Sequence, residues 1–253
     1  MKRHWPVGAE VSEAAIEGGR MLYDTSRTSN FSADFFEPEY WRKYEAIEGT
    51  ARGRGTTWFI RTGDSSFVLR HYRRGGLMAK VSKDSYLWGG ESDTRAWAEW
   101  YLTYHLHRAG LPVPTPIAAR YQRRGLVYRA DLITQRIENS ESLAQRLLKG
   151  PLSFTQWIAV GRCLRRFHDA GVHHADLNAH NILLTPEQVY LIDFDRGELR
   201  KRGWWTDTNL VRLYRSLEKI TLLAAPESFT DQDWHSLLAG YRESAGLPQP
   251  ALA

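Results

Sequence analysis

The chain has 253 residues, of which 42% are hydrophobic and 25% are charged, as in an ordinary globular protein with one large domain or two small lobes. A single cysteine, Cys163, excludes an intrachain disulfide, and no segment approaches the ~18 consecutive apolar residues that span a bilayer. The amino-terminal residues lack the apolar run of a secretory signal, so the sequence predicts a protein of the reducing cytoplasm.

The net charge of +5 and the pI near 9.3 predict an anionic partner, such as a membrane surface, a charged substrate or nucleic acid. Nucleic acid is disfavoured, because the basic residues are not interleaved with aromatic residues in a stacking pattern. The charge falls into three clusters, each of which is equally consistent with a solvated face: Arg70, Arg73, Arg74, Lys80 and Lys83; Arg120, Arg123, Arg124 and Arg129; and Arg196, Arg200, Lys201 and Arg202.

The first 45 or so residues are expected to form a loosely structured lead-in with one helical signal. That signal covers residues 34–41, with Asp34 as the N-cap and Pro38 in the first turn. Residues 48–72 then follow the pattern of a strand, a glycine-rich turn, a strand, a turn and a strand. A helix is predicted from about residue 93 to residue 108, where Gly110 closes it.

Short strands resume over residues 126–137, and the rest of the chain is predicted to be mostly helical, over residues 143–148, 154–170, 210–222 and 231–245. Strands followed by helices predict an α+β, bilobal, protein-kinase-like fold. Residues 1–137 are expected to hold an amino-terminal extension and an N-lobe with a small antiparallel sheet, and residues 138–253 a mainly helical C-lobe.

The run from His174 to Asn181, His-Ala-Asp-Leu-Asn-Ala-His-Asn, precedes an Asp193-Phe194 pair by twelve residues. This spacing is typical of the kinase catalytic centre, H-x-D-L-x-x-x-N followed by D-F-G. We expect Asp176 to accept the proton of an attacking hydroxyl, while Asn181 and Asp193 hold Mg²⁺ between the phosphates of ATP. His174 is expected to brace this loop through hydrogen bonds.

Two short strands, residues 182–185 and 189–193, flank a Thr-Pro-Glu-Gln turn. Such a hairpin brings Asn181 and Asp193 to the same edge. An exposed polar loop before a buried strand is the alternative, but it does not explain four residues at these fixed positions.

In the amino-terminal half, Gly49, Gly53 and Gly55 are candidates to cover the phosphates of ATP through their backbone N–H groups. A plain hairpin turn explains the three glycines almost as well. The strand over residues 67–70 follows, and Arg70 stands where kinases have lysine. Alternation places Val68 and Arg70 on one face of this strand. A surface arginine is the alternative for Arg70, and Lys80 is the second candidate for the phosphate contact.

Glu99 is the expected partner of Arg70. Leu102 and Leu106 follow it at i+3 and i+7, which places Glu99 on the apolar face of its helix. A carboxylate on a buried face requires a cationic partner, so we predict an Arg70–Glu99 ion pair.

Asp195 replaces the glycine that usually follows Asp-Phe, and only residues 196–205 separate this motif from the next helix. This length is too short for the ledge on which a peptide substrate docks. The acceptor is therefore expected to be a small molecule or a glycan.

The chain resembles the 3-deoxy-D-manno-octulosonic acid (Kdo) kinases, in the lipopolysaccharide-kinase branch of the protein-kinase-like fold. The resemblance extends from about Met21 to the last predicted helix and is most specific in residues 51–59, 67–77, 84–88, 108–117 and 174–184. It implies transfer of the γ-phosphate of ATP to the 4-hydroxyl of a Kdo sugar on lipid A, with Asp176 as the catalytic aspartate and Arg70 as a family feature.

Kdo carries a carboxylate and lipid A carries phosphates, and we expect Arg73, Arg74 or the basic segment 196–202 to bind them. Basic residues beside Trp204 and Trp205 suit a peripheral position on the cytoplasmic face of the inner membrane, although packing under the last helices explains both tryptophans equally well. No obligate protein partner is evident from the sequence.

Three alternatives remain open. A heptose kinase of the lipopolysaccharide core shares the fold and a basic acceptor site. An aminoglycoside-type phosphotransferase is expected to have an acidic acceptor site, against which the arginine clusters argue. A pseudokinase acting as a binding module is suggested by the missing lysine and by Asp195, but the catalytic motif is intact.

Overall fold

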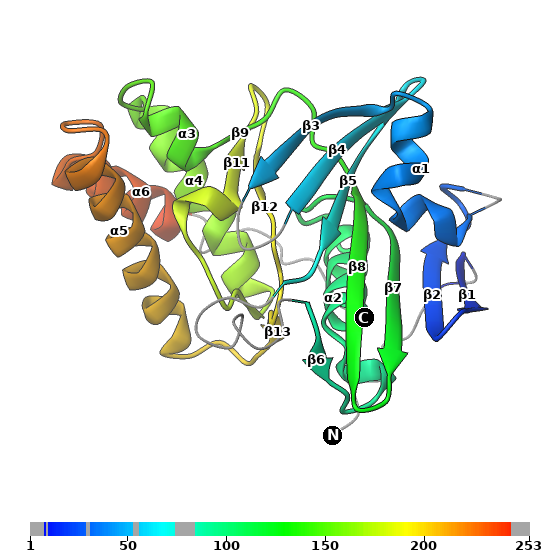
Figure 1. The fold of residues 1–253 in the computed structure, drawn as a ribbon. Helices are drawn as coiled ribbons and strands as arrows, with labels where there is room; N and C mark the ends of the chain where they lie inside the picture. Colours follow the sequence, from blue (N-terminus) through cyan, green and yellow to red (C-terminus); the bar gives the residue numbers. More distant parts are fainter. Residues whose placement is uncertain (1–7, 9, 29–30, 53–55, 74–83, 244–253) are drawn as a thin grey trace. The chain divides into compact units, whose positions relative to one another are not determined.

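The computed structural model describes residues 8, 10–28, 31–52, 56–73 and 84–243. The chain divides into two compact units, the first formed by Met1–Tyr104 and Thr115–Arg136 and the second by His105–Pro114 and Ile137–Ala253. Antiparallel strands dominate the first unit and helices dominate the second, so the predicted α+β class is confirmed (Figure 1).

Within its described residues, the first unit has one antiparallel sheet in the order β1–β2–β7–β8–β5–β4–β3, and β6 pairs with β8 beside β5. Its strands and helices are β1 Val11–Ile16, β2 Gly19–Asp24, α1 Pro38–Lys43, β3 Ile47–Arg52, β4 Thr56–Thr62, β5 Ser65–His71, β6 Tyr86–Leu87, α2 Arg95–Arg108, β7 Pro116–Arg124 and β8 Val127–Gln135. The last turn of α2, from His105, belongs to the second unit.

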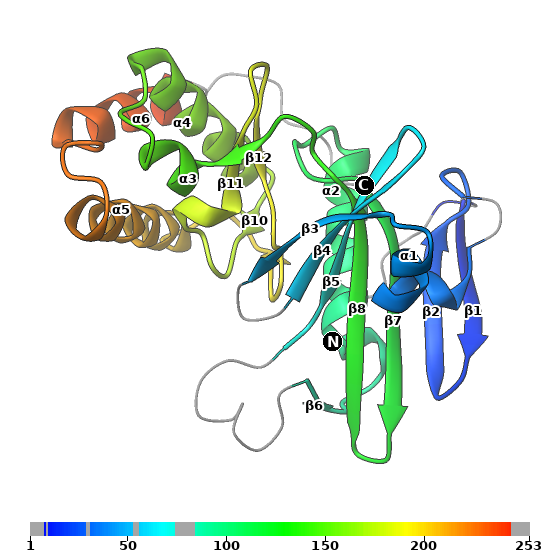
Figure 2. The same cartoon turned by 45° about the horizontal axis from the view of Figure 1, so that its top comes forward.

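Alternation along β5 separates two apolar clusters on opposite faces of the sheet. Phe67 and Leu69 pack with Trp41 of α1 on one face. Tyr72 packs on the other face with Trp97 and its neighbours on α2. Figure 2 shows α1 in front of the sheet and α2 behind it. The face predicted for Arg70 is therefore the face that α2 covers.

The predicted loose lead-in is wrong, because β1 and β2 form a hairpin that extends the sheet through β7. Gly18 turns the hairpin at φ +73°, a conformation that favours glycine. Met21 and Leu22 of β2 are buried on opposite faces of the sheet. Strands β1 and β2 are each only six residues long, so their sequence signal is weak. Pairing of β2 with the distant strand β7 stabilises the hairpin.

The helical signal at residues 34–41 corresponds to two short elements. Ser32, not Asp34, caps the 3₁₀ turn Ala33–Phe36, because its hydroxyl accepts the backbone N–H of Asp34. Pro38 begins α1 as predicted. The short strands predicted over residues 126–137 are one nine-residue strand, β8, at the centre of the sheet.

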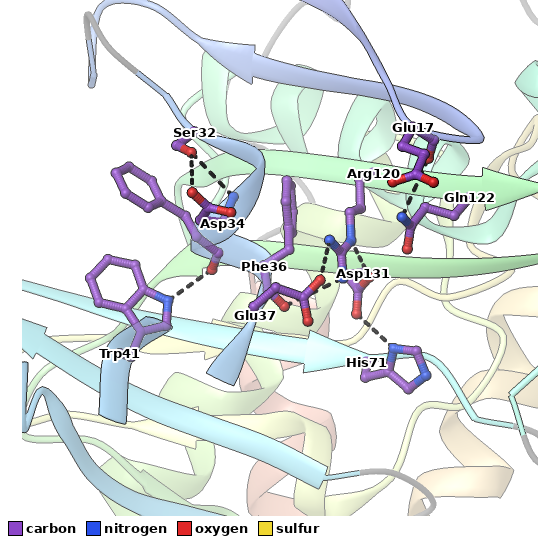
Figure 3. A network of polar contacts seen from close by, with 11 residues as sticks. Glu17, Ser32, Asp34, Phe36, Glu37, Trp41, His71, Arg120, Gln122 and Asp131 are labelled. Carbon is purple, nitrogen blue, oxygen red and sulfur yellow. Dashed lines mark hydrogen bonds and ion pairs between the residues drawn. The ribbon is translucent and has the colours of Figure 1, made fainter. Parts of the chain in front are cut away.

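For Arg120, a member of the second basic cluster, the alternative of a solvated face is excluded, because this residue is 6% exposed and lies under the 3₁₀ turn (Figure 3). Its Nε donates to Oδ2 of Asp131 and its Nη1 donates to Oε1 of Glu37, both at 2.7 Å. His71 contacts the other oxygen of Asp131 at 2.6 Å. Burial opposes the charge of Arg120, but Asp131 and Glu37 outweigh it and raise the pKa of Arg120. This network ties the segment before α1 to strands β5, β7 and β8.

The second unit contains β9 Glu141–Ser142, α3 Leu143–Leu147, α4 Phe154–Asp169, β10 Val172–His173, β11 Ile182–Leu184, β12 Val189–Leu191, β13 Glu198–Leu199, α5 Trp205–Leu223 and α6 Asp231–Glu243. The four predicted helical segments are confirmed, with α5 starting five residues earlier than predicted and residues beyond 243 outside the described part. Helices α4 and α6 cross closely at Gly161 and Gly240. A Cβ on Gly161 would lie 2.0 Å from the backbone oxygen of Leu237, and a Cβ on Gly240 would lie 2.2 Å from that of Ile158. Both distances are too short for any side chain, so the crossing requires glycine at both positions.

Among the described residues, no helix combines the length and the apolar character that crossing a membrane requires.

Candidate active site

Strands β11 and β12 lie side by side as a hairpin (Figure 2). Their pairing places Asn181 and Asp193 at the same end of the two strands, as the sequence predicts. Ile182 pairs with Leu191, and the N–H of Ile192 donates to the carbonyl of Asn181 at 3.0 Å. Thr185 closes the other end, where its N–H donates to the carbonyl of Gln188 at 3.0 Å. The hairpin therefore fixes the separation between the amide and the carboxylate.

His174 links the loop of Asp176 to the strand that leads into Asp193. Its Nδ1 accepts the backbone N–H of Asp176 at 3.2 Å, so Nε2 carries the proton and donates to the carbonyl of Ile192 at 2.9 Å. The predicted bracing role of His174 is confirmed. Burial lowers the pKa of His174, and the opposing influences of Ile192, Asp193 and Asp176 do not overcome it. The ring therefore stays neutral and keeps this tautomer.

Asn181 fixes the same loop from the other side. Its Nδ2 donates to the backbone carbonyl of Asp176 at 2.9 Å, and the side chain is buried. The nitrogen is thereby committed to the loop, which assigns the amide oxygen as the atom available to a metal ion.

Asp193 has a left-handed backbone conformation, with φ +62°, and the residue is half-buried. Aspartate tolerates this conformation better than most residues, and such outliers cluster at functional sites. Phe194 follows as a fully buried anchor that stacks on Phe167 at 5.9 Å and touches the ring of His174 at 5.1 Å. The chain then turns at Arg196, φ +59°, so Asp195 occupies the usual glycine position without a positive φ.

Helix α5 contributes a polar face that sequence reasoning missed. Asn209 Oδ1 accepts the N–H of His174 at 3.3 Å, and its Nδ2 donates to the carbonyl of His174 at 3.0 Å. Arg212 Nη1 donates to Oδ1 of Asp176 at 3.0 Å. Ser216 Oγ accepts the N–H of Ala179 at 3.2 Å. The spacing i, i+3, i+7 of polar residues beside a buried apolar stripe was the available signal.

The donor set fits magnesium. Mg²⁺ prefers oxygen ligands, is usually bound through one or two carboxylates, and takes further oxygens from phosphates and water. Asp193 offers a carboxylate and Asn181 an amide oxygen at one end of the hairpin. Among the described residues, no group of three or more His, Cys, Asp or Glu side chains gathers into a metal site of another kind.

In the first unit, Arg70 and Glu99 form the predicted ion pair. Arg70 Nη2 contacts Oε2 of Glu99, which is 4% exposed. Tyr72, which sequence reasoning missed, donates its hydroxyl to the same oxygen and accepts from Arg70 Nη2 at 2.9 Å. The guanidinium also lies 4.7 Å from the centre of the Tyr72 ring. Arg70 is therefore held from two sides and its direction is fixed.

The remaining candidates of the first unit are only partly covered by the described residues. Gly49 lies within β3 at a register shift, and a Cβ there would meet only Phe59 at 3.8 Å, so packing does not demand glycine. Arg73 follows β5 and is exposed. Gly53, Gly55, Arg74 and Lys80 lie outside the described residues.

The basic segment 196–202 belongs to the second unit and is partly committed to ion pairs. Arg200 contacts Glu198, and Arg202 Nη1 lies 2.8 Å from Oδ1 of Asp169. The two neighbouring tryptophans differ, because Trp204 is 79% exposed whereas Trp205 is 5% exposed and donates to the carbonyl of Lys201.

Comparison with protein families identifies the chain. The model of the lipopolysaccharide kinase (Kdo/WaaP) family matches residues 38–241, which is most of the sequence and includes Arg70, Asp176 and Asp193. The chain belongs to the lipopolysaccharide kinase (Kdo/WaaP) family. Membership confirms the family predicted from the sequence.

Curated relatives within the lipopolysaccharide kinase family carry the name 3-deoxy-D-manno-octulosonic acid kinase. The Haemophilus influenzae protein is 42% identical over 231 residues, covering 88% of this chain and 95% of its own. The Actinobacillus succinogenes protein is 43% identical, covering 82% and 90%. The Vibrio vulnificus protein is 41% identical, covering 91% and 98%.

A solved structure, described as WaaP in complex with acyl carrier protein, has a similar fold. It matches with a TM-score of 0.51 and 21% sequence identity, over 82% of this chain and 87% of that one. At this identity the similarity establishes the fold of the lipopolysaccharide kinase family and nothing finer.

Proposed function

We propose that this protein is a 3-deoxy-D-manno-octulosonic acid kinase that transfers the γ-phosphate of ATP to the 4-hydroxyl of a Kdo residue on Kdo-lipid A, in the assembly of the lipopolysaccharide inner core. The observation that carries the proposal is the 41–43% identity to curated kinases of that name across more than four fifths of the chain. The arrangement around Asp176 supports the type of reaction, and the identity to these relatives supports the choice of acceptor.

Asp176 is the proposed base. Its carboxylate is partly exposed, while its backbone N–H is held by His174 and its carbonyl by Asn181. The side chain is thus accessible and the main chain beneath it is fixed, as proton transfer in a defined geometry requires. Asp176 orients the sugar hydroxyl and takes its proton as the sugar oxygen attacks the γ-phosphorus, and ADP departs.

Asn181 and Asp193 are the proposed ligands of Mg²⁺, which neutralises charge on the phosphates when it is bound with ATP. Arg70 is the proposed phosphate contact. Because Glu99 and Tyr72 hold the guanidinium, its charge is presented in a fixed direction, and Lys80 remains the second candidate. The glycines at 49, 53 and 55 are proposed to cover the phosphates through their N–H groups.

For the acidic acceptor, Arg73, Arg74 and the segment 196–202 remain proposed contacts. Arginine forks bind carboxylate and phosphate groups through paired hydrogen bonds. Arg200 and Arg202 are already paired with acidic side chains, so Arg196 and Lys201 are the members of the segment best placed to meet an acceptor.

We also propose a peripheral position at the cytoplasmic face of the inner membrane, where the lipid-anchored acceptor is accessible. The support is Trp204, which is 79% exposed beside exposed Lys201 and Arg202. Exposed tryptophan suits the headgroup region, and each basic residue near an anionic surface contributes about 1 kcal/mol. The packed position of Trp205 shows that only one of the two tryptophans is available for such contact.

The function is tested with the purified full-length protein, Mg²⁺, ATP and either Kdo-lipid A or a heptosylated core acceptor. Mass spectrometry of the products is expected to show one added phosphate on Kdo-lipid A, and nuclear magnetic resonance is expected to place it on the 4-hydroxyl of Kdo. Phosphorylation of the heptosylated acceptor on heptose, with Kdo-lipid A unmodified, would identify a heptose kinase instead. ATP binding without transfer to either acceptor would identify a binding module.

The membrane position is tested by sedimentation with vesicles. Binding is expected to anionic vesicles and not to zwitterionic ones, to weaken with added salt, and to weaken further in the Trp204→Ser variant. Binding that is independent of salt and of Trp204 would contradict this part of the proposal.

A further inference from the structure

Arg212 is the charged residue that α5 directs at the proposed base. Its Nη1 donates to Oδ1 of Asp176 at 3.0 Å, between the contacts that Asn209 and Ser216 make with the same loop. Each of these two neighbours holds main-chain groups. Arg212 alone of the three contacts the reacting carboxylate.

This contact is not needed to hold the loop in place. His174 and Asn181 hold the main chain of Asp176. The side chain of Arg212 is 52% exposed and that of Asp176 is 40% exposed. Ion pairs with this exposure are screened by water and contribute little to stability. Stability of the fold therefore does not explain why an arginine stands at position 212.

The geometry leaves Arg212 able to hold a second anion. A guanidinium has five N–H donors in a rigid fork, and the contact with Asp176 uses Nη1. More than half of the side-chain surface is accessible. Arginine is the residue best suited to paired hydrogen bonds with a carboxylate or phosphate, because its fork matches their geometry.

The charge of Arg212 also acts on the neighbouring strand residue His173. Burial lowers the pKa of His173, and the charges of Arg200, His174 and Arg212 lower it further, against the opposing influence of Glu198. A sugar acid whose hydroxyl reaches Asp176 comes close to the guanidinium of Arg212, which lies 3.0 Å from the same carboxylate.

We propose that Arg212 is a specificity-determining residue that binds the carboxylate of the acceptor while it remains in contact with Asp176. One guanidinium then fixes both the base and the acid group of the acceptor, and so aligns the acceptor hydroxyl with the carboxylate that takes its proton. The inference rests on the proposed sugar-acid kinase function, and it assigns the recognition of the acid group to α5.

The experiment compares Arg212→Gln and Arg212→Lys with wild type in the full-length protein. Arg215→Gln is the matched control, since Arg215 is exposed one helical turn further along α5. Each protein is assayed with Kdo-lipid A and with the same acceptor after its Kdo carboxylate is converted to the primary amide. The KM for acceptor, the KM for ATP and kcat are measured separately, and thermal unfolding checks that each variant is folded.

With the acid acceptor, Arg212→Gln is expected to raise the KM for acceptor at least tenfold and to leave the KM for ATP unchanged, while Arg212→Lys recovers part of the loss. With the amide acceptor, wild type is expected to show the raised KM already, and Arg212→Gln to raise it by less than twofold more. Arg215→Gln is expected to stay within twofold of wild type in every measurement.

A loss in Arg212→Gln that is equal for the acid and amide acceptors would overturn the inference, because Arg212 would then only position Asp176. An unchanged KM for acceptor in Arg212→Gln would overturn it as well. If wild type does not phosphorylate Kdo-lipid A, the proposed function itself fails and the inference fails with it. The wild-type measurement thus separates the two failures.

Discussion

Asn209 binds both backbone groups of His174, with its Oδ1 accepting the N–H and its Nδ2 donating to the carbonyl. Asn209 is 2% exposed, so α5 and the loop that carries Asp176 share a buried polar contact. This amide therefore attaches α5 to the main chain two residues before Asp176.

Asn209→Ala is expected to lower the free energy of unfolding by about 2–4 kcal/mol, because two buried backbone groups lose their partner. Transfer activity is expected to fall as well, since the loop below Asp176 is no longer fixed. Urea unfolding and phosphotransfer assays measure the two effects. Thr208→Ala is the control at an exposed neighbouring position and is expected to change stability by less than about 0.5 kcal/mol. Equal stability of the two variants would contradict the role given to Asn209.

Asp176→Asn is expected to reduce kcat by about 10²–10⁴-fold, because an amide cannot take the proton of the hydroxyl. The fold and the affinity for Mg·ATP are expected to be retained, since the side chain is partly exposed and the main-chain contacts remain. Single-turnover kinetics and calorimetric titration with a non-hydrolysable ATP analogue separate the two. Asp207→Asn, exposed on α5, is the control. Wild-type turnover in Asp176→Asn would remove the base assignment.

Asp193→Asn is expected to abolish Mg²⁺-dependent binding of ATP while leaving the structure intact. Asparagine is, with aspartate, among the residues that best tolerate the left-handed conformation at φ +62°, so the change isolates the loss of charge. Asp193→Ala is expected to lose binding and also some stability, because alanine is strained there. Calorimetry with and without Mg²⁺ gives the comparison. Binding that survives in Asp193→Asn would exclude this carboxylate as the metal ligand.

Arg120→Met is expected to destabilise the protein by about 3–5 kcal/mol, because it leaves Oδ2 of the buried Asp131 carboxylate without the arginine that pairs with it. The matched control is Arg129→Met, which removes an exposed arginine from an ion pair with Asp84 and is expected to cost less than about 1 kcal/mol. Denaturant unfolding of both variants measures the difference. Similar losses in the two variants would contradict the importance of burial in this network.

Stability is expected to fall as the pH decreases below about 6.5, the ordinary pKa of histidine. Burial in α4 lowers the pKa of His168 to about 3, so the unfolded chain binds a proton that the folded ring does not. The contribution of neutral His168 to the free energy of unfolding is complete above pH ~6.5. As the pH falls from about 6.5 to about 3, this contribution decreases by about 1.4 kcal/mol per pH unit.

His168→Gln is expected to reduce this pH dependence by the equivalent of one proton between pH 6 and pH 4, and not to remove it, because burial also lowers the pKa of His174. Denaturant unfolding at a series of pH values measures the slope. His235→Gln, exposed on α6, is expected to leave the slope unchanged. An unchanged slope in His168→Gln would show that this ring is not the proton-linked group.

Local patterns predicted much of the site. A two-strand hairpin with a Thr-Pro-Glu-Gln turn was sufficient to bring Asn181 and Asp193 together, because hairpin pairing is fixed by residues close in sequence. Strand alternation at Arg70 and helical spacing at Glu99 predicted their ion pair, since each period assigns a face. These patterns predict the face of the strand or helix on which each side chain lies.

Contacts between distant segments were not predicted. Arg212 meets Asp176 across 36 positions and Asn209 meets His174 across 35, and no local period relates α5 to the catalytic loop. The burial of Arg120 was not predicted either, because a sequence shows the charge of a residue and not its exposure. The strands β1 and β2 were missed because their stability comes from pairing with each other and, through β2, with the distant strand β7.

The sequence by itself determined the family, the fold class and the identity of the proposed base and metal ligands, because these depend on residue types at short, fixed spacings. Tertiary structure decided which charges are buried, which tryptophan is exposed, and which helix reaches Asp176, the proposed base. The physical reason is that burial and ion pairing depend on the chain folding back on itself, and segments far apart in sequence become neighbours only in the packed protein.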